Sequence, residues 1–207
     1  MVDVLNKAGP FSANSEVVIA GPSIHLAAMK AGFRPDIAVA AEDVGFKRGY
    51  GAFTGEISAE MLADFGIKWT LTGHSERRVG FGYPGETSSV VGVKTKNAID
   101  NGISVMACIG EMLADRQSGS TMKVCAEQLE GIKAALKTED WKKVVVAYEP
   151  VWAIGTGVTA TPQQVQIIDE CVTSQKSYIY HRYFHDFPHH SYHFHVSSGP
   201  RYSQRDP

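Results

Sequence analysis

The sequence VVVAYEPVWAIGTG, residues 144–157, gives the strongest indication of the fold. It opens with a run of β-branched residues, which is the pattern of a strand buried on both faces. Glu149 then marks the end of that strand, because Pro150 holds the preceding backbone extended. Bulky apolar residues follow, bounded by Pro150 on one side and by Gly155 and Gly157 on the other, which is the composition of a hinged flap. A carboxylate at a strand end beneath an apolar flap suits a general base that works away from water.

The rest of the chain repeats the same kind of strand at regular intervals. Four more strands are predicted at residues 16–20, 37–41, 68–72 and 103–108, with helices at residues 24–30, 58–65, 87–101 and 125–136. Such alternation predicts a parallel sheet with helices packed outside it. Asp43, His74 and Glu149 follow strand ends, the edge at which such folds carry their sites. The pattern alone leaves a doubly wound sheet and a β/α barrel as alternatives.

Composition and charge narrow the class of protein. The 207 residues are enough for one domain with a sizeable core, and the net charge of -2 indicates neither a nucleic-acid nor a membrane partner. The three cysteines show no CxxC spacing, so we expect free thiols in a reducing compartment. No apolar run is long enough to span a membrane, and the first residues lack the layout of a secretion signal. We therefore expect a cytoplasmic protein.

A second polar segment, GHSERR at residues 73–78, joins a strand to a turn that can start a helix. His74 closes the strand, and an imidazole at a helix N-terminus feels a positive potential that disfavours its charged form. We therefore expect a neutral His74 that can donate a hydrogen bond to a carbonyl or enediolate oxygen. The alternative is a single histidine at a strand end whose ring is satisfied by the backbone.

Five motifs in a fixed order give the chain a resemblance to a known family. GHSERR (73–78) and AYEPVWAIGTG (147–157) are accompanied by GAFTGEIS (51–58), ACIGE (107–111) and TATPQQ (159–164). Together they resemble the triosephosphate isomerase family, and the similarity runs over roughly residues 1–170. The resemblance implies an α/β fold of the TIM (β/α)8 barrel type.

The resemblance also implies roles for three charged residues. Glu149 matches the family's catalytic base, which moves a proton between adjacent carbons of a triose phosphate, and His74 matches the residue that polarises the carbonyl. Glu76 matches the catalytic carboxylate just behind that histidine. Triosephosphate isomerase is itself the standard example of a glutamate base paired with a neutral histidine. The family interconverts dihydroxyacetone phosphate and D-glyceraldehyde 3-phosphate, in glycolysis and gluconeogenesis, and uses neither a cofactor nor a metal.

Other matched residues belong to the flap and to the subunit interface of the family's homodimer. The closing flap corresponds to Pro150, Val151, Trp152, Ala153, Ile154, Gly155 and Thr156. Gly155 is expected to offer its backbone N–H to the substrate phosphate. Thr54 matches the tip of the loop that reaches into the partner subunit, and Cys108 matches a cysteine of the barrel interior. The alternatives are a core anchor at Trp152, a turn residue at Thr54 and a small apolar filler at Cys108.

The sequence departs from the family pattern in three places. It contains no GNWKMN-like segment, which carries the family's catalytic lysine, and no GGS or GG turn, which surrounds the phosphate. Residues 79–85, which follow GHSERR, differ from the family's sequence at this place. We therefore expect an incomplete barrel with strands 2–6 of the family, lacking the first strand and the last two, with open edges at residues 16–20 and 144–148. The lost contacts predict little or no isomerase activity for this chain.

The end of the chain differs in composition from the rest. Residues 1–172 are expected to form the partial barrel domain, whereas residues 173–207 are expected to be a disordered, His/Tyr-rich tail unrelated to the family. Six of the eight histidines lie in this tail: His181, His185, His189, His190, His193 and His195. No cysteine accompanies them, and Pro188 interrupts any helix, so we predict no metal site. A histidine metal binder remains the alternative.

A hypothesis from another class is a non-catalytic interaction protein. Its exposed strand edges and its interface loop would pair with an intact isomerase subunit. The absent lysine segment separates the two hypotheses, because an enzyme needs that segment and an interaction fragment does not.

Overall fold

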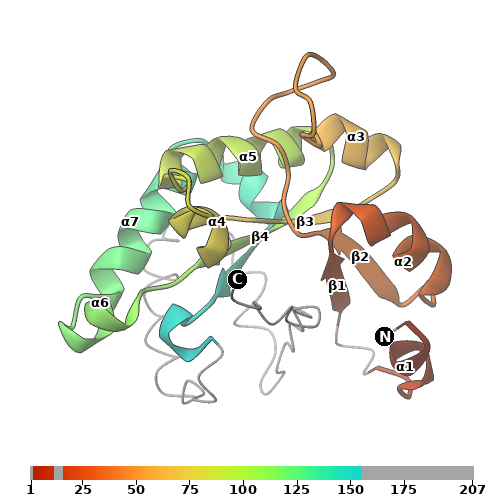
Figure 1. The fold of residues 1–207 in the computed structure, drawn as a ribbon, viewed down its shortest axis with the longest axis horizontal. Helices are drawn as coiled ribbons and strands as arrows, with labels where there is room; N and C mark the ends of the chain where they lie inside the picture. Colours follow the sequence, from red (N-terminus) through yellow and green to blue (C-terminus); the bar gives the residue numbers. More distant parts are fainter. Residues whose placement is uncertain (1, 12–15, 155–207) are drawn as a thin grey trace, which may run out of the picture.

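The computed structural model describes residues 2–11 and 16–154, which form a parallel sheet with helices packed along one face (Figure 1). The strands are β1 (Val17–Gly21), β2 (Ile37–Ala41), β3 (Trp69–Thr72), β4 (Ser104–Ile109) and β5 (Val144–Tyr148), in the spatial order β1-β2-β3-β4-β5. A doubly wound sheet reverses its strand order at a switch point, whereas the strand order of this sheet follows the sequence throughout. The topology is therefore that of the α/β barrel.

Helices and short 3-10 turns connect the strands. The α-helices are α1 (Val2–Lys7), α2 (Leu26–Gly32), α3 (Ala59–Asp64), α4 (Ser75–Val79), α5 (Ser88–Asp100), α6 (Leu113–Gln117) and α7 (Thr121–Lys133), and the 3-10 turns are η1 (Ser23–His25), η2 (Thr138–Lys143) and η3 (Val151–Ala153). Hydroxyl caps set two helix starts. Ser58 Oγ accepts the Met61 N–H at the start of α3, and Thr87 Oγ1 accepts the Val90 N–H at the start of α5, each at 3.3 Å.

Two helix predictions need correction. The helix expected at residues 24–30 consists of η1 followed by α2, which continues to Gly32. The helix expected to reach Leu136 ends at Lys133, because Leu136 N–H bonds to the carbonyl of Lys133, three residues earlier, in a tight turn. The five strands start and end within one residue of the predicted ranges.

The register of the sheet brings the ends of β3 and β5 to the same height. Thr72 of β3 pairs with Ala107 of β4, and Ile109 of β4 pairs with Tyr148 of β5. The two pairs are separated by two residues along β4. The position two residues beyond Thr72 is therefore level with Tyr148, with β4 between them.

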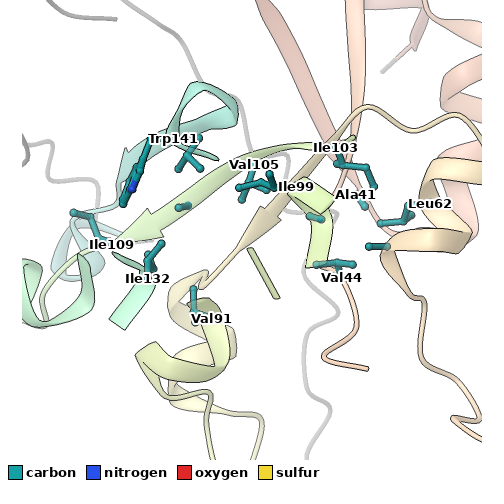
Figure 2. Close-up of a cluster of buried hydrophobic side chains, with 14 of the residues drawn as sticks. Ala41, Val44, Leu62, Val91, Ile99, Ile103, Val105, Ile109, Ile132 and Trp141 are labelled. Atoms are coloured by element: carbon teal, nitrogen blue, oxygen red, sulfur yellow. The ribbon is translucent and has the colours of Figure 1, made fainter. Parts of the chain in front are cut away.

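Side chains alternate between the two faces of each strand. On the helix-covered face, Val105, Ala107 and Ile109 of β4 belong to the largest buried cluster, together with side chains of α3, α5 and α7 (Figure 2). A second cluster lies on the opposite face and consists of Val18, Ala20, Ala40, Leu71, Met106 and Cys108. Burial on both faces explains why the strands read as continuous apolar runs rather than as alternating ones.

Some predictions fall outside the described residues. They are those for Gly155, for Thr156 and for the histidine-rich tail at 173–207. Within the described residues, β1 pairs with β2 alone and β5 pairs with β4 alone. No helix in residues 2–11 and 16–154 has the length and apolar character needed to cross a bilayer.

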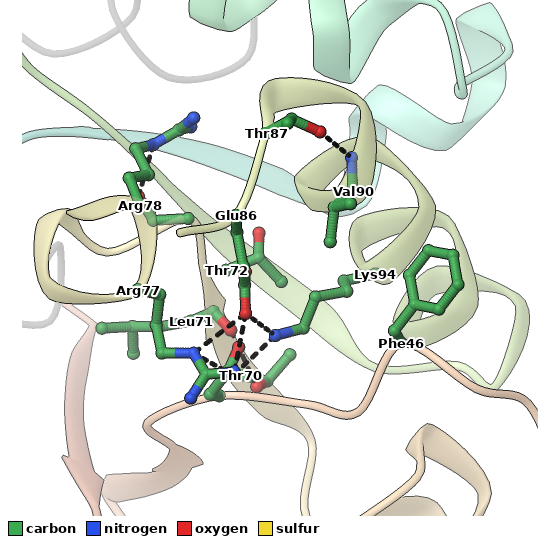
Figure 3. A network of polar contacts seen from close by, with 12 residues as sticks. Phe46, Thr70, Leu71, Thr72, Arg77, Arg78, Glu86, Thr87, Val90 and Lys94 are labelled. Atoms are coloured by element: carbon green, nitrogen blue, oxygen red, sulfur yellow. Dashed lines mark hydrogen bonds and ion pairs between the residues drawn. The ribbon is translucent and has the colours of Figure 1, made fainter. Parts of the chain in front are cut away.

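A buried ionic cluster joins the segment after β2 to α4 and α5 (Figure 3). The Lys94 side chain of α5 is 2% exposed, and its Nζ lies 2.6 Å from Asp43 Oδ2 and 2.8 Å from Glu86 Oε1. Arg77 contacts the same two carboxylates at 3.0 Å and 2.7 Å. Two cations thus alternate with two carboxylates. Asp43, a strand-end residue in the sequence pattern, therefore belongs to this structural cluster.

Replacing Lys94 with methionine should destabilise the protein strongly. The change keeps most of the side-chain volume but leaves Asp43 and Glu86 to share the charge of Arg77 alone. Breaking a buried ion pair from one side typically costs about 3–5 kcal/mol. Urea unfolding followed by far-UV circular dichroism measures the loss.

Lys123→Met is the matched control for this variant. Lys123 lies on the surface, 3.9 Å from Glu127, with 77% of its side chain exposed. Its replacement should cost less than about 1 kcal/mol, as for other exposed ion pairs. Equal losses in the two variants would contradict a structural role for the buried cluster.

Candidate active site

The carboxyl ends of β3 and β5 bring a histidine and a glutamate into contact. His74 lies two residues past the end of β3, and Glu149 directly follows β5. The His74 Nε2 atom lies 3.0 Å from Glu149 Oε1. Their side chains are 18% and 22% exposed, so the pair is largely shielded from solvent. The structure thus unites the two residues singled out by GHSERR and AYEPVWAIGTG.

His74 is the N-cap of α4, and hydrogen bonds orient its ring. Nδ1 accepts the backbone N–H of Glu76 at 3.3 Å, which places the proton of a neutral imidazole on Nε2. Nε2 then donates to Glu149 Oε1, while the backbone N–H of Ser75 donates to Glu149 Oε2 at 3.2 Å. Both carboxylate oxygens of Glu149 are therefore occupied by donors from the start of α4.

This contact changes the acid–base properties of both residues. The pKa of His74 is raised above its ordinary value of 6.5, chiefly by the hydrogen bond to the Glu149 carboxylate, although burial opposes the rise. Burial raises the pKa of Glu149, but the hydrogen bond and charge of His74 outweigh it, so the pKa lies below its ordinary value of 4.5. The sequence predicted that the helix N-terminus would disfavour the charged form of His74 and so lower its pKa, and this direction is wrong. A full carboxylate charge at 3.0 Å outweighs the partial charge of a five-residue helix.

Two further carboxylates lie near the imidazole. Glu76 Oε2 is 3.8 Å from His74 Nδ1, and the Glu76 side chain is 69% exposed, so it lies on the solvent side of the pair. Burial raises the pKa of Glu42, repulsion from Glu76 adds to the rise, and attraction to His74 opposes it. In the part of the chain that the structure describes, no group of three or more His, Cys, Asp or Glu side chains is arranged to hold a metal ion.

The backbone of Glu149 packs closely against the end of β4. Its N–H donates to the Ile109 carbonyl at 2.7 Å, one step beyond the strand ladder. A Cβ atom on Gly110 would lie 1.8 Å from the Glu149 carbonyl oxygen, so this approach requires glycine. The Gln128 side chain holds the same turn, because its Oε1 accepts the Gly110 N–H at 2.8 Å and its Nε2 donates to the Gly110 carbonyl at 3.0 Å.

A buried carboxylate anchors the described part of the predicted flap. Trp152 Nε1, in η3, donates to Glu111 Oε1 at 3.0 Å. Glu111 is fully buried and also accepts hydrogen bonds from Tyr148 Oη and from an Arg116 guanidinium nitrogen, each at 3.1 Å. The Arg116 guanidinium lies 4.6 Å from the Trp152 ring centroid, in cation–π contact. Trp152 is therefore held through both its N–H group and its ring face.

Thr54 lies apart from the His74–Glu149 pair, exposed on the loop between β2 and α3 that projects beside α3 in Figure 1. Helix α5 supports the base of this loop. Asn97 Nδ2 donates to the Phe46 carbonyl at 2.8 Å, and Arg48 pairs with Asp100 at 2.7 Å. The structure thus presents Thr54 as an exposed turn residue on an anchored loop.

Cys108 lies in the buried cluster on the sheet face away from the helices. A closed barrel turns this face inward, which agrees with the position expected from the resemblance. Burial raises the pKa of the Cys108 thiol to about 12, with the nearby Glu149 carboxylate adding to the rise. The thiol therefore stays protonated at neutral pH.

Sequence analysis did not single out Glu111, Gln128 or Arg78. Glu111 ends the ACIGE motif, and a carboxylate directly after a strand, like Glu149, was the available signal. Gln128 and Arg78 lie on helices, where polar residues are normally solvent-exposed. Their contacts with strand-end carbonyls depend on the packing of elements distant in sequence, so no local pattern marks them.

Comparisons with known proteins agree with the resemblance drawn from the motifs. The sequence profile described as triosephosphate isomerase matches residues 1–185. The triosephosphate isomerase of Coprinopsis cinerea is 48% identical over 166 residues, which cover 80% of this chain and 64% of that protein. That of Neurospora crassa is 47% identical over 175 residues, covering 84% and 68%. The cytosolic triosephosphate isomerase of Oryza sativa subsp. japonica is 50% identical over 155 residues, covering 75% and 59%. The chain thus spans 59–68% of the length of these curated relatives.

The contact between His74 and Glu149 predicts a defined pH dependence. Because the pKa of His74 is raised on folding, protonated His74 stabilises the fold, fully so below pH 6.5. This contribution is lost as the pH rises through the pKa of His74 in the folded protein. Because the pKa of Glu149 is lowered on folding, the Glu149 carboxylate stabilises the fold above pH 4.5. This contribution is lost as the pH falls through the pKa of Glu149 in the folded protein. The difference in unfolding free energy between the unmodified chain and Glu149→Gln should therefore be largest between pH 4.5 and 6.5.

Histidine NMR titration checks the same contact directly. The pKa of His74 should fall in Glu149→Gln, because the neutral amide removes the main cause of its rise. Glu127→Gln, an exposed substitution on α7, is the control and should leave the His74 titration unchanged. A His74 titration that is identical in the unmodified chain and in Glu149→Gln would contradict the contact.

Glu111→Gln should destabilise the protein and release Trp152. Glutamine lacks the negative charge of Glu111, so the hydrogen bonds from Trp152 and Arg116 to Oε1 lose their charge assistance. A hydrogen bond to a charged group contributes about 1.5–3 kcal/mol, against about 0.5–1.5 kcal/mol for a neutral one. Urea unfolding measures the loss, and acrylamide quenching of tryptophan fluorescence should increase.

The control for this variant is Glu127→Gln on α7. Glu127 is 66% exposed, so its replacement should change the unfolding free energy by less than about 0.5 kcal/mol. Unchanged quenching in Glu111→Gln would show that Glu111 does not hold Trp152.

Proposed function

Because the chain belongs to the triosephosphate isomerase family, we propose that its site interconverts dihydroxyacetone phosphate and D-glyceraldehyde 3-phosphate. Glu149 is the base that moves a proton between the two adjacent carbons, and His74 polarises the carbonyl. The observation that carries the proposal is the 3.0 Å approach of His74 Nε2 to Glu149 Oε1 at the carboxyl ends of β3 and β5. The reaction needs neither a cofactor nor a metal, because both proton transfers go through side chains.

The substrate must replace the hydrogen bonds that hold the pair in the structure. Glu149 first leaves His74 Nε2 and the Ser75 N–H, and its freed oxygen removes a proton from the substrate carbon. The His74 Nε2–H then donates to the carbonyl oxygen and stabilises the negative charge that develops on it. His74 Nε2 also relays a proton, giving its own to the former carbonyl oxygen and taking the hydroxyl proton from the adjacent oxygen. Return of the carbon-bound proton from Glu149 to the neighbouring carbon then completes the isomerisation and restores both side chains. Glu76 stays behind the histidine and fixes the ring through its backbone N–H at 3.3 Å.

The segment Pro150–Ile154 supplies the body of a flap over this pair. Its apolar side chains exclude water, which strengthens every charge interaction in the site and protects the enediolate intermediate. Trp152 holds the flap body through Glu111 in the arrangement described above. Gly155, with its N–H toward the phosphate, and Thr156 complete the flap in this proposal.

Taken by themselves, these 207 residues should be less active than a protein that also carries the lysine segment and the phosphate turns. Its 207 residues contain no GNWKMN-like segment and no GGS or GG turn. In addition, Glu42 and Glu76 lie near His74 and repel an anionic substrate. Loss of a single contact to a developing charge costs about 10²–10³ in rate, and several are absent here.

We further propose a cytoplasmic homodimer. The anchored loop exposes Thr54, which in this proposal contacts a second subunit. The relative from Oryza sativa subsp. japonica is named as cytosolic, which supports the location.

The alternative function is a non-catalytic subunit that associates with intact isomerase subunits. The same exposed loop favours it, because this surface needs no catalytic residue to dock. Co-purification of the tagged chain with an intact isomerase, without turnover of its own, would support this function over the enzymatic one.

A coupled assay of dihydroxyacetone phosphate conversion tests the enzymatic function. Glu149→Gln removes the base and should lower kcat by about 10²–10⁴, the usual contribution of general base catalysis. Glu127→Gln is the control and should leave kcat unchanged. Turnover by the unmodified chain no greater than that of Glu149→Gln would refute the enzymatic proposal.

A further inference from the structure

The Arg78 guanidinium joins three elements directly beneath the candidate active site. Its Nε donates to the Gly73 carbonyl after β3 at 2.7 Å, and one terminal nitrogen donates to the Cys108 carbonyl of β4 at 3.0 Å. The other terminal nitrogen donates to Ser88 Oγ of α5 at 3.2 Å. All three nitrogens thus have acceptors. Among the described residues, no carboxylate lies within ion-pair distance of Arg78.

Gly73 is shaped to receive this guanidinium. Its φ is +69°, in the left-handed region that favours glycine, and His74 follows it directly. A Cβ atom at Gly73 would lie 2.7 Å from an Arg78 terminal nitrogen and 2.8 Å from Val91 Cγ1. The guanidinium therefore packs into the space that the missing side chain leaves, against the backbone that orients His74.

On its other side, Arg78 supports the strand end next to Glu149. The Cys108 carbonyl accepts from Arg78, and the carbonyl of the next residue, Ile109, accepts the Glu149 N–H at 2.7 Å. A shift of the β4 backbone at Cys108 would therefore move Glu149 relative to His74. Arg78 lies between the two backbone segments whose spacing sets the contact between the catalytic pair.

We propose that Arg78 is a positioning residue for the reaction, one that sets the separation of His74 and Glu149 by fixing the Gly73 and Cys108 carbonyls. This inference rests on the proposed isomerase function. The planar fork of arginine reaches both carbonyls and Ser88 at once, whereas the single ammonium of lysine cannot. Lysine keeps the positive charge, so Arg78→Lys changes the geometry and leaves the net charge intact.

The test compares Arg78→Lys with a matched control elsewhere in the full chain. Arg34 also clamps carbonyls, with guanidinium bonds of 2.6 Å to the Ala8 carbonyl and 3.0 Å to the Gly9 carbonyl, and it pairs in addition with Asp36 at 2.8 Å. Arg34→Lys loses the same kind of contact away from the site. Both variants should lose unfolding free energy in urea, but only Arg78→Lys should affect the catalytic pair.

Two readouts separate positioning from mere stability. In NMR titration of histidine-labelled protein, with His74 assigned by its loss in His74→Gln, the pKa of His74 should fall in Arg78→Lys and stay constant in Arg34→Lys. In the isomerase assay, kcat should fall about 10²-fold in Arg78→Lys, as for a displaced catalytic group, with KM changed less than about twofold. Ser88→Ala removes one of the three bonds and provides a milder variant, with a smaller shift in the same direction, should Arg78→Lys fail to fold.

The outcomes also distinguish this inference from the proposed function. An unchanged His74 titration in both Arg78→Lys and Ser88→Ala, or an equal shift in Arg34→Lys, overturns the positioning role. A shifted titration in a chain without isomerase turnover supports the positioning of the pair and refutes only the proposed function.

Discussion

The register between β3, β4 and β5 is the constraint on which the site depends. β4 is buried on both faces, so a slip by one residue would exchange its two sets of side chains and put each set into the cluster packed for the other. The observed register places His74 level with the end of β5, and Glu149 is the next residue to leave the sheet. The 3.0 Å contact between them thus follows from backbone pairing, and the flap and helix caps refine it.

Buried apolar side chains and buried charged side chains lie at different heights along the strands of the sheet. The middles of the strands bury aliphatic side chains, whereas the carboxyl end buries charged groups, each with several partners: Glu111 with its donors, Lys94 with two carboxylates, and Arg78 with two carbonyls and a hydroxyl. A buried polar group is costly unless it is satisfied, so a network of this kind is stable in few arrangements. The buried charged side chains therefore fix the loops that carry the site more strictly than the buried apolar side chains alone would.

Much of this architecture was predictable from the chain, and the rest was not, for physical reasons. Runs such as Val144–Val146 marked the strands, and motif order identified His74, Glu149 and the barrel class. The burial of Lys94 was not predictable, because a lysine on a helix normally faces solvent and only the fold reveals its two carboxylate partners. The direction of the His74 pKa shift was also missed, since the helix terminus is local in sequence and the decisive carboxylate is not.

Gly110 illustrates how little separates the two strand ends. The Glu149 carbonyl occupies the volume that any side chain at Gly110 would need. The backbone of the candidate base can therefore take this position only while residue 110 has no Cβ atom. Every single-nucleotide change of a glycine codon that alters the residue introduces at least a Cβ atom. The site is consequently sensitive at a residue with no functional group, and a survey of reactive side chains alone would overlook it.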